Sequence, residues 1–191
     1  GCVCAVYMDW RGIFSYDGSV LLEAYSLLIM RILHIINGLG KGGAEAVLIR
    51  LILHDLENEH HVVSLTGPGF YSTVLFENNI DVYHINFRDK KVLISNILSL
   101  LRVIKGIDPS IVQTWLYLSD LVGSIAARLL GIEKIFWNIR HSELNLKDTK
   151  FTTILVAKLC SMLSRWLPKG IVFCANKSYE YHKKFGYSSE S

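Results

Sequence analysis

Short runs rich in β-branched residues alternate along this chain with longer segments that have apolar residues at helical spacing. From Arg31 onward, the runs typical of strands are RILHII (31–36), HVVSLT (61–66), DVYHIN (81–86), SIVQT (110–114), IEKIFWN (132–138) and GIVFCA (170–175). Strands that are apolar almost throughout are typical of a parallel sheet covered on both faces. No other feature of the sequence limits the fold as strongly.

The segments between these runs have the period of amphipathic helices. Apolar residues fall at i, i+3, i+4 and i+7 in the segments 44–51, 93–104 and 122–129, and further helices are predicted at about 149–166 and 176–185. The prolines fall in the gaps between predicted elements, at Pro68, Pro109 and Pro168. Strand and helix units that repeat in this way predict an α/β fold, a Rossmann-like doubly wound parallel sheet.

Composition bounds the class of protein. The chain has 191 residues, of which 51% are hydrophobic and 19% charged, with a net charge of +3. Such a chain can build a core, and its small net charge, with no block of basic residues, predicts no nucleic-acid binding. The cysteines form no Cys-x-x-Cys pair, which favours a reducing cytosol. The adjacent His60 and His61 point to opposite faces of a strand, so no shared metal site is expected there.

The N-terminal region is less regular. The most apolar stretch, 20–36, is interrupted by Glu23 and Arg31, so it falls short of the roughly 20 apolar residues of a membrane-spanning helix. Residues 1–29 have no basic start or clear cleavage site, and no signal peptide is predicted. They form either an ordinary N-terminal extension or a non-native, upstream-translated segment, because Met30 directly precedes the first strand.

A glycine-rich loop, INGLGKGGAE (36–45), follows the first predicted strand. Its Gly-x-Gly-x-x-Gly spacing fits a dinucleotide site, but the second strand ends in SLTG without the carboxylate that would hold a ribose. A P-loop would need Lys and Ser or Thr where Ala44 and Glu45 stand. Two interpretations remain: a tight turn, or a helix start whose free N–H groups at Gly42 and Gly43 hold a phosphate.

Four segments together resemble the N-terminal domain of family 4 glycosyltransferases, which are retaining enzymes of the two-domain GT-B fold. They are ILHIINGLGKGGAEAVLIRL (32–51), IVQTWLYLSDLVGSIAARLLG (111–131), IFWNIRHSEL (135–144) and IVFCANKSYEYHKKFGY (171–187). The resemblance implies an acceptor-side domain at 30–187 and the start of an interdomain linker at 188–191. In the family a second Rossmann domain follows and binds the nucleotide sugar through two glutamates seven residues apart. That C-terminal donor domain is absent from this sequence.

The resemblance also implies roles for the residues of the glycine loop. Gly42 and Gly43 are expected to approach the donor diphosphate, where preorganised N–H groups stabilise the leaving charge. Glu45 is expected either to contact the acceptor or only to complement the dipole at the helix start.

The segment TWLYLSD (114–120) is expected to end the fourth strand near the ligand crevice. Trp115 and Tyr117 either stack on an acceptor sugar or cover the sheet edge. Asp120 is a candidate catalytic residue, and capping the following helix is its commoner alternative. Close relatives tend to carry a histidine at the position of Leu118, so this departure puts catalytic competence in question or shifts the role to a neighbour.

Arg140 and His141 end the fifth predicted strand on the ligand side. Arg140 is expected to bind the donor phosphate, and His141 either orients an acceptor hydroxyl or forms an ordinary hydrogen bond. The chain contains no Asp-x-Asp pair, so no metal and no bound cofactor are expected; the nucleotide sugar is a substrate.

The predicted helix FTTILVAKLCSMLSRWLPK (151–169) is mostly apolar. It either packs against the sheet or rests on an anionic membrane, with Lys158 and Arg165 toward the lipid.

The resemblance therefore implies that the chain is the acceptor-side domain of a cytoplasmic glycosyltransferase, inactive alone, that works at the inner membrane face. Its partners would be a nucleotide-sugar donor and a polysaccharide or glycolipid precursor. The alternatives are a non-catalytic Rossmann-like binding module and an NAD-dependent oxidoreductase.

Overall fold

The computed structural model describes residues 29–87, 89–144 and 149–188. Almost all of the predicted N-terminal extension and most of the predicted linker start lie outside these residues. No helix within the described part of the chain is long and apolar enough to cross a membrane.

Six strands form one sheet in which every pair of neighbours is parallel. The spatial order is β3-β2-β1-β4-β5-β6, so the winding reverses between β1 and β4. The strands are β1 (Arg31–Ile36), β2 (Glu59–Ser64), β3 (Asp81–His84), β4 (Ile111–Trp115), β5 (Ile135–Ile139) and β6 (Gly170–Phe173). The predicted doubly wound α/β fold is confirmed.

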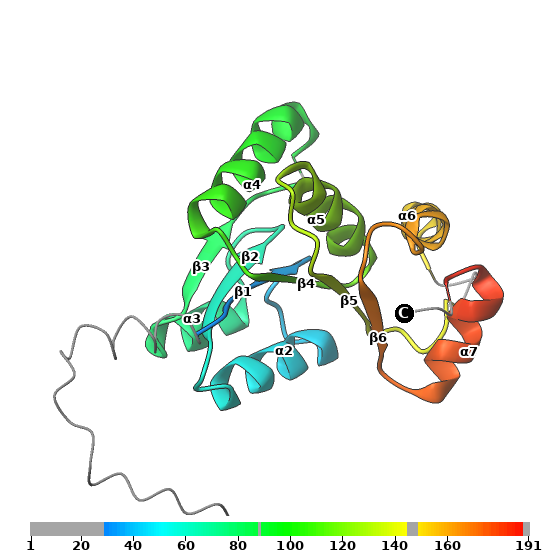
Figure 1. The fold of residues 1–191 in the computed structure, drawn as a ribbon, viewed down its shortest axis with the longest axis horizontal. Coiled ribbons are helices and arrows are strands. Elements are labelled where there is room, and N and C mark those ends of the chain that lie inside the picture. The colour runs from blue at the N-terminus through cyan, green and yellow to red at the C-terminus, as the bar shows by residue number, and fades with distance from the viewer. Residues whose placement is uncertain (1–28, 88, 145–148, 189–191) are drawn as a thin grey trace, which may run out of the picture.

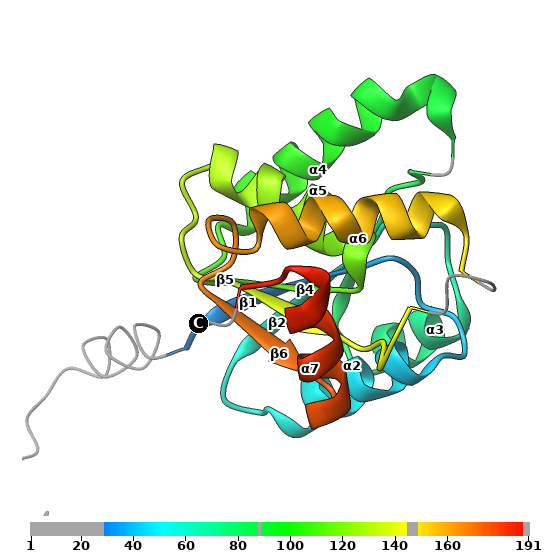
Figure 2. The same ribbon diagram turned by 90° about the vertical axis from the view of Figure 1, so that its right-hand side faces the viewer.

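Helices cover both faces of the sheet (Figures 1 and 2). They are α2 (Gly43–His54), α3 (Phe70–Glu77), α4 (Leu93–Ile107), α5 (Tyr117–Leu129), α6 (Phe151–Leu163) and α7 (Asn176–Phe185), with a short 3₁₀ turn, η1 (Lys90–Val92), before α4. Helices α2 and α3 lie on one face, and α4, α5 and α6 lie on the other (Figure 1). Helix α7 packs beside the edge strand β6 and against α6.

Alternate residues along each strand enter two separate cores. Leu33 and Ile35 of β1 belong to the core beneath α4, α5 and α6, whereas Ile36 belongs to the core beneath α2. Both cores consist mainly of fully buried aliphatic and aromatic side chains. Because neighbouring residues face opposite sides, a polar residue at a strand end is committed to one face by its position alone.

The sequence predicted most of these elements. The bounds of β1 and α7 agree with prediction, and the other strands differ by one to three residues at their ends. Helix α3 was not predicted, because its one fully buried residue is Leu75 while Phe70 and Phe76 are exposed, so no apolar stripe marks it. The predicted proline gaps are confirmed by the positions of Pro68, Pro109 and Pro168 between elements.

Candidate functional site

Two neighbouring cavities open at the carboxyl ends of the strands. The first has a volume of about 560 Å³ and the second about 420 Å³, and both are lined in part by Asn37 and Leu118. Asn37 follows β1 and Leu118 follows β4, so the cavities meet where the winding of the sheet reverses. Ligands of open α/β sheets bind at this switch point.

The first cavity is formed by two loops in direct contact. The glycine loop supplies Gly38–Gly40, and the loop after β2 supplies Leu65–Gly69. The Tyr71 N–H donates to the Leu39 carbonyl at 2.9 Å, and Gly69 packs directly on that carbonyl, with no space for a Cβ. The sequence analysis missed this second loop, although the TGPG run at its start was a signal for a tight turn.

Gly42 and Gly43 lie at the start of α2. Gly42 is the N-cap and has no side-chain cap, and Gly43 is exposed with open space around it. The Glu45 carboxylate folds back over Gly42, and Glu45 also lines the first cavity. Neither glycine lines either cavity, so their phosphate-binding role stays a prediction that rests on the free N–H groups of the helix start.

The second cavity contains His141. Its walls come from the start of α5, the end of β5 and the start of α6, including Tyr117, Thr152 and Val156. The imidazole stacks on the Tyr117 ring, with centroids 5.3 Å apart and an interplanar angle of 15°, while the residue remains exposed to the solvent. Partial burial lowers the pKa of His141, so at neutral pH the ring is neutral and can accept a hydrogen bond from a hydroxyl.

A buried network from α7 holds His141 in place. The Tyr117 hydroxyl lies 2.6 Å from His182 Nε2, and His182 Nδ1 lies 2.7 Å from the Ser178 carbonyl oxygen. The Nδ1–H of His182 must donate to that carbonyl, which leaves Nε2 to accept the Tyr117 proton. Ser178 Oγ donates to the His141 carbonyl at 2.7 Å. The sequence analysis missed this network, because residues 117, 141, 178 and 182 share no local pattern.

Trp115 and Tyr117 are both buried, which favours their alternative role of covering the sheet over stacking on a sugar. Trp115 has no exposed surface and lies in the core beneath α2. Tyr117 is 3% exposed, with its ring against His141 and His182. Their alternative role, covering the sheet, agrees with this burial.

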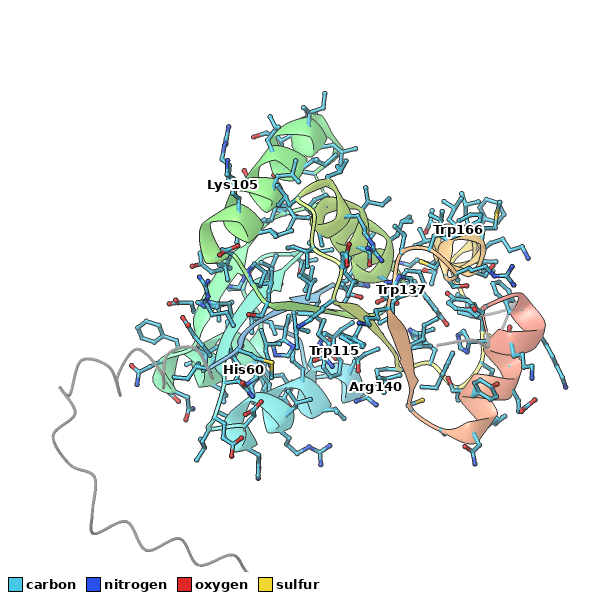
Figure 3. The ribbon with its side chains drawn as sticks, in the orientation of Figure 1. His60, Lys105, Trp115, Trp137, Arg140 and Trp166 are labelled. Atoms are coloured by element: carbon cyan, nitrogen blue, oxygen red, sulfur yellow. The ribbon has the colours of Figure 1, made fainter. Side chains whose placement is uncertain are left out.

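Arg140 lies over the face of Trp115. Its Cζ is 5.1 Å from the centre of the Trp115 ring, a cation–π geometry, and Figure 3 shows the two side chains together at the ends of β4 and β5. Arg140 Nε is buried and has no hydrogen-bond partner among the described residues. Burial lowers the pKa of Arg140. Arg140 lines neither cavity, so its phosphate-binding role stays a prediction that rests on its position directly after β5.

A buried polar chain continues from Trp115 beneath α2. Trp115 Nε1 donates to His34 Nδ1 at 3.4 Å, and His34 Nε2 lies 2.9 Å from His60 Nδ1. Because the Trp115 N–H can only donate, each histidine must carry its proton on Nε2, and His60 Nε2 then points to Asp55 Oδ2 at 3.3 Å. That last contact does not qualify as a hydrogen bond, so His60 Nε2 is a buried atom without a hydrogen-bond partner among the described residues. Burial lowers the pKa of His34 to about 3 and also lowers that of His60, so both rings are neutral.

Asp120 is fully buried, and the geometry does not support its predicted catalytic role. Thr114 Oγ1 donates to its Oδ1 at 2.6 Å, and Oδ2 has no partner among the described residues. Burial raises the pKa of Asp120 well above its usual value. Helix α5 begins at Tyr117 with Leu116 as its N-cap, so Asp120 lies within the first turn and does not cap the helix.

Asn37 is a cleft residue that the sequence analysis did not identify. Its Oδ1 accepts hydrogen bonds from the Ser119 backbone N–H at 3.0 Å and from Ser119 Oγ at 2.6 Å. This pair joins the end of β1 to the start of α5 across the switch point. Leu118, the position at which the sequence departs from the glycosyltransferase pattern, stands between the two cavities and close to His141.

Other parts of the described structure contain fewer candidate functional groups. No group of three or more His, Cys, Asp or Glu residues within the described ranges could hold a metal. A cavity of about 460 Å³ with Arg31, Glu59 and His61 in its wall lies at the amino ends of the strands, opposite the ligand crevice. His60 and His61 point to opposite faces, as predicted: His60 contacts His34 beneath α2, whereas His61 contacts Glu59.

Comparison with known proteins supports the fold at the level of one domain. No protein-family model and no curated protein matches the chain. Among solved structures, HepE from Anabaena in complex with UDP matches 84% of this chain with a TM-score of 0.68 and 17% identity. The apo lipopolysaccharide outer core galactosyltransferase WaaB matches 83% with a TM-score of 0.58 and 17% identity. The UDP-GlcNAc 2-epimerase from Methanocaldococcus jannaschii matches 83% with a TM-score of 0.55 and 12% identity.

The chain spans less than half of each of these proteins, 42% of HepE and 43% of WaaB and of the epimerase. It has the fold of one Rossmann-like domain of a GT-B enzyme. The likeness covers both a galactosyltransferase and a UDP-GlcNAc 2-epimerase, so the fold alone does not distinguish transfer from epimerisation.

Proposed function

We propose that this chain is the acceptor-side domain of a retaining family 4 glycosyltransferase. It would work with a donor domain that binds the nucleotide sugar and would be inactive without it. The observation that carries the proposal is the pair of cavities at the switch point, with the glycine loop on one side of Leu118 and His141 on the other. A donor entering from a second domain would meet the glycine loop, while an acceptor would occupy the cavity beside His141.

In this mechanism the domain mainly positions the reactants and stabilises the leaving group. The N–H groups at Gly42 and Gly43 and the guanidinium of Arg140 would face the donor diphosphate, where negative charge gathers. His141 would orient the acceptor hydroxyl through its neutral imidazole. Because Leu118 cannot hydrogen-bond, His141 is the imidazole in the described cleft that remains for this task.

The substrate classes follow from the fold and from the shape of the cleft. HepE was solved with UDP, so UDP-sugars are the first donors to try. Threonines and the histidine in the second cavity favour a hydroxyl-rich acceptor, a glycan or the sugar of a glycolipid precursor. A cytoplasmic enzyme at the inner face of the membrane would meet both.

The test is sugar transfer by the full product of the gene that encodes this chain. The protein would be incubated with each of a panel of UDP-sugars and with a cell-envelope extract, and the labelled glycan would be measured. We expect transfer from one donor, and we expect His141→Ala to lower kcat about 100-fold, as for the loss of a positioned acid–base group. The adjacent, exposed Ser142→Ala is the matched control and should retain activity.

Other outcomes would contradict the proposal in distinct ways. Glycan binding without transfer from any donor would indicate the non-catalytic module. Conversion of a UDP-sugar without any acceptor would indicate an epimerase, and tight binding of NADH would indicate an oxidoreductase. Full activity of His141→Ala would remove His141 from the mechanism, even if transfer is observed.

A further inference from the structure

Helix α6 is built with its small residues inward and its large apolar residues outward. Its buried side is formed by Ala157, Cys160, Ser161 and, in the turn that follows, Ser164. The outer stripe is Phe151, Leu155, Leu159, Met162 and Trp166, with exposed fractions of 77, 50, 39, 64 and 70%. These positions fall within one side of a helix, because they are spaced by three or four residues. A helix that served only the core would place its large apolar residues the other way round.

Basic residues are frequent in the sequence around this stripe, and acidic residues are missing from that segment. From residue 149 to residue 179 the sequence contains no Asp or Glu, but it contains Lys150, Lys158, Arg165, Lys169 and Lys177. Two of these cations have partners within the domain: Lys158 Nζ donates to the Phe185 carbonyl at 3.4 Å, and Lys177 Nζ lies 3.0 Å from Glu143 Oε2. Arg128 of α5 adds a cation beside the end of the stripe, because its Nη2 donates to the Trp166 carbonyl at 3.2 Å. Figure 3 shows Trp166 on the outer side of α6, away from the sheet.

The stripe also adjoins the cleft. Thr152 and Val156, which lie next to Phe151 and Leu155 in the sequence, line the second cavity with His141. Helix α6 therefore connects the acceptor cavity to an exposed apolar surface, which is the arrangement a membrane-bound acceptor would require.

From these observations we infer that α6 lies flat on an anionic lipid bilayer. Phe151, Leu155, Leu159, Met162 and Trp166 enter the boundary between headgroups and acyl chains, and the surrounding cations face the lipid phosphates. The excess of positive charge in the segment that carries α6 favours lipid over a second protein domain, because polar partner surfaces usually carry charges of both signs. The inference stands without the transferase proposal, since it concerns a surface and can be tested by binding alone.

The test is sedimentation of the full chain with vesicles of phosphatidylglycerol and phosphatidylcholine, and with vesicles of phosphatidylcholine alone. We expect binding to the anionic vesicles that weakens as salt is raised. Leu155→Gln/Met162→Gln should weaken binding at least about tenfold, because each large apolar side chain buried in lipid contributes about that factor. Arg165→Glu should weaken it by roughly fivefold or more, since each cation near an anionic surface contributes about that much. Phe76→Gln on α3, which is 80% exposed on the opposite face of the sheet, is the matched control and should bind normally.

Trp166 provides a second, local measurement. Trp115 and Trp137 are fully buried, so lipid should leave their emission unchanged. Because Trp10 lies outside the described residues, it is replaced, and any change in the emission of a Trp10→Phe protein on adding vesicles is then assigned to Trp166. Vesicles should shift its emission to shorter wavelength, and brominated acyl chains should quench it. The inference is overturned if anionic vesicles do not bind, if the Leu155→Gln/Met162→Gln protein binds as well as the unmodified chain, or if brominated lipid leaves Trp166 unquenched. It is also overturned if Trp166 is shielded from acrylamide without lipid, because a second copy or another part of the protein would then cover α6.

Discussion

The buried histidine His34 should make the fold sensitive to mild acid. It is wholly enclosed between the sheet and α2, and its two ring nitrogens are already engaged by Trp115 and His60. Burial lowers its pKa from 6.5 to about 3. In the unfolded chain the ring becomes protonated below about pH 6.5, whereas in the folded chain it stays neutral, so acid favours the unfolded state.

The size of the effect follows from these two pKa values. His34 has no effect on the pH dependence well above pH 6.5, and the loss grows as the pH falls from 6.5 toward 3. At pH 5 the protonated form of His34 outnumbers the neutral form about 30-fold in the unfolded chain, whereas the folded chain stays almost entirely neutral, and this difference corresponds to about 2 kcal/mol of lost stability. The pKa of His60 is lowered as well, so its burial adds a loss of the same sign. The buried carboxyl of Asp120 acts in the opposite direction, because its pKa is raised.

A comparison of variants isolates the His34 contribution. The free energy of unfolding would be measured by urea denaturation at pH 7.5 and pH 5 for the unmodified chain and for His34→Gln, which cannot titrate. Contributions from Asp120 occur in both proteins and cancel. We expect the unmodified chain to lose about 2 kcal/mol more than His34→Gln, and we expect the exposed control His54→Gln to behave as the unmodified chain does. Equal losses in the unmodified chain and His34→Gln would refute the reasoning, because His34 would then titrate alike in both states.

Three further predictions concern single positions. The Asp120→Asn protein should become more stable relative to the unmodified chain as the pH rises above about 4, by up to about 1.4 kcal/mol per pH unit. The reason is that the buried carboxyl of Asp120 must stay neutral, whereas the same carboxyl ionises in the unfolded chain. Urea denaturation from pH 4 to 7 measures the difference in unfolding free energy between the two proteins, and a difference that does not change with pH would contradict the prediction. Gly69→Ala should destabilise the fold by at least about 1 kcal/mol, since its methyl group would meet the backbone of the glycine loop, whereas Gly67→Ala has open space and should be neutral in the same thermal melts. Tyr117→Phe should lower the free energy of unfolding by about 1–3 kcal/mol, because it leaves the buried Nε2 of His182 without a hydrogen-bond donor. An unchanged midpoint in urea denaturation would show that this hydrogen bond contributes nothing to stability.

The sequence predicted the fold well because buried parallel strands carry their signal locally. Each strand is a short apolar run, and most helices have a stripe that faces the sheet. Helix α3 was not predicted because only Leu75 of its eight residues is fully buried, so the sequence shows almost no helical pattern of apolar residues there. Helix α6 was found, but its orientation was not predictable, because apolar residues on both sides of a helix do not show which side meets the core.

The candidate site was only partly predictable from the sequence. The position of His141 at a strand end predicted its place beside the second cavity, and the glycine loop forms one wall of the first cavity. The aromatic residues of TWLYLSD were expected either to stack on a sugar or to cover the sheet edge, and the pleat turns Trp115 into the core beneath α2. The residues that hold the site side chains in place are distant in the sequence, such as His182 on the last helix, which contacts Tyr117. Local residue spacing does not predict contacts between such distant positions.

Two buried networks converge on neighbouring residues at the end of β5. On one face of the sheet the chain from Asp55 through His60 and His34 fixes Trp115, on which Arg140 rests. On the other face, His182 fixes Tyr117, on which His141 rests.

Because consecutive residues point to opposite sides, one strand end can offer a cation toward α2 and an imidazole toward α6 with separate supports. A perturbation of either network should therefore disturb one side chain and spare its neighbour. His34→Gln should alter anion binding at Arg140, whereas Tyr117→Phe should alter hydroxyl recognition at His141. If the cleft joins a donor phosphate to an acceptor hydroxyl, this division keeps the positioning of each reactant independent of the other.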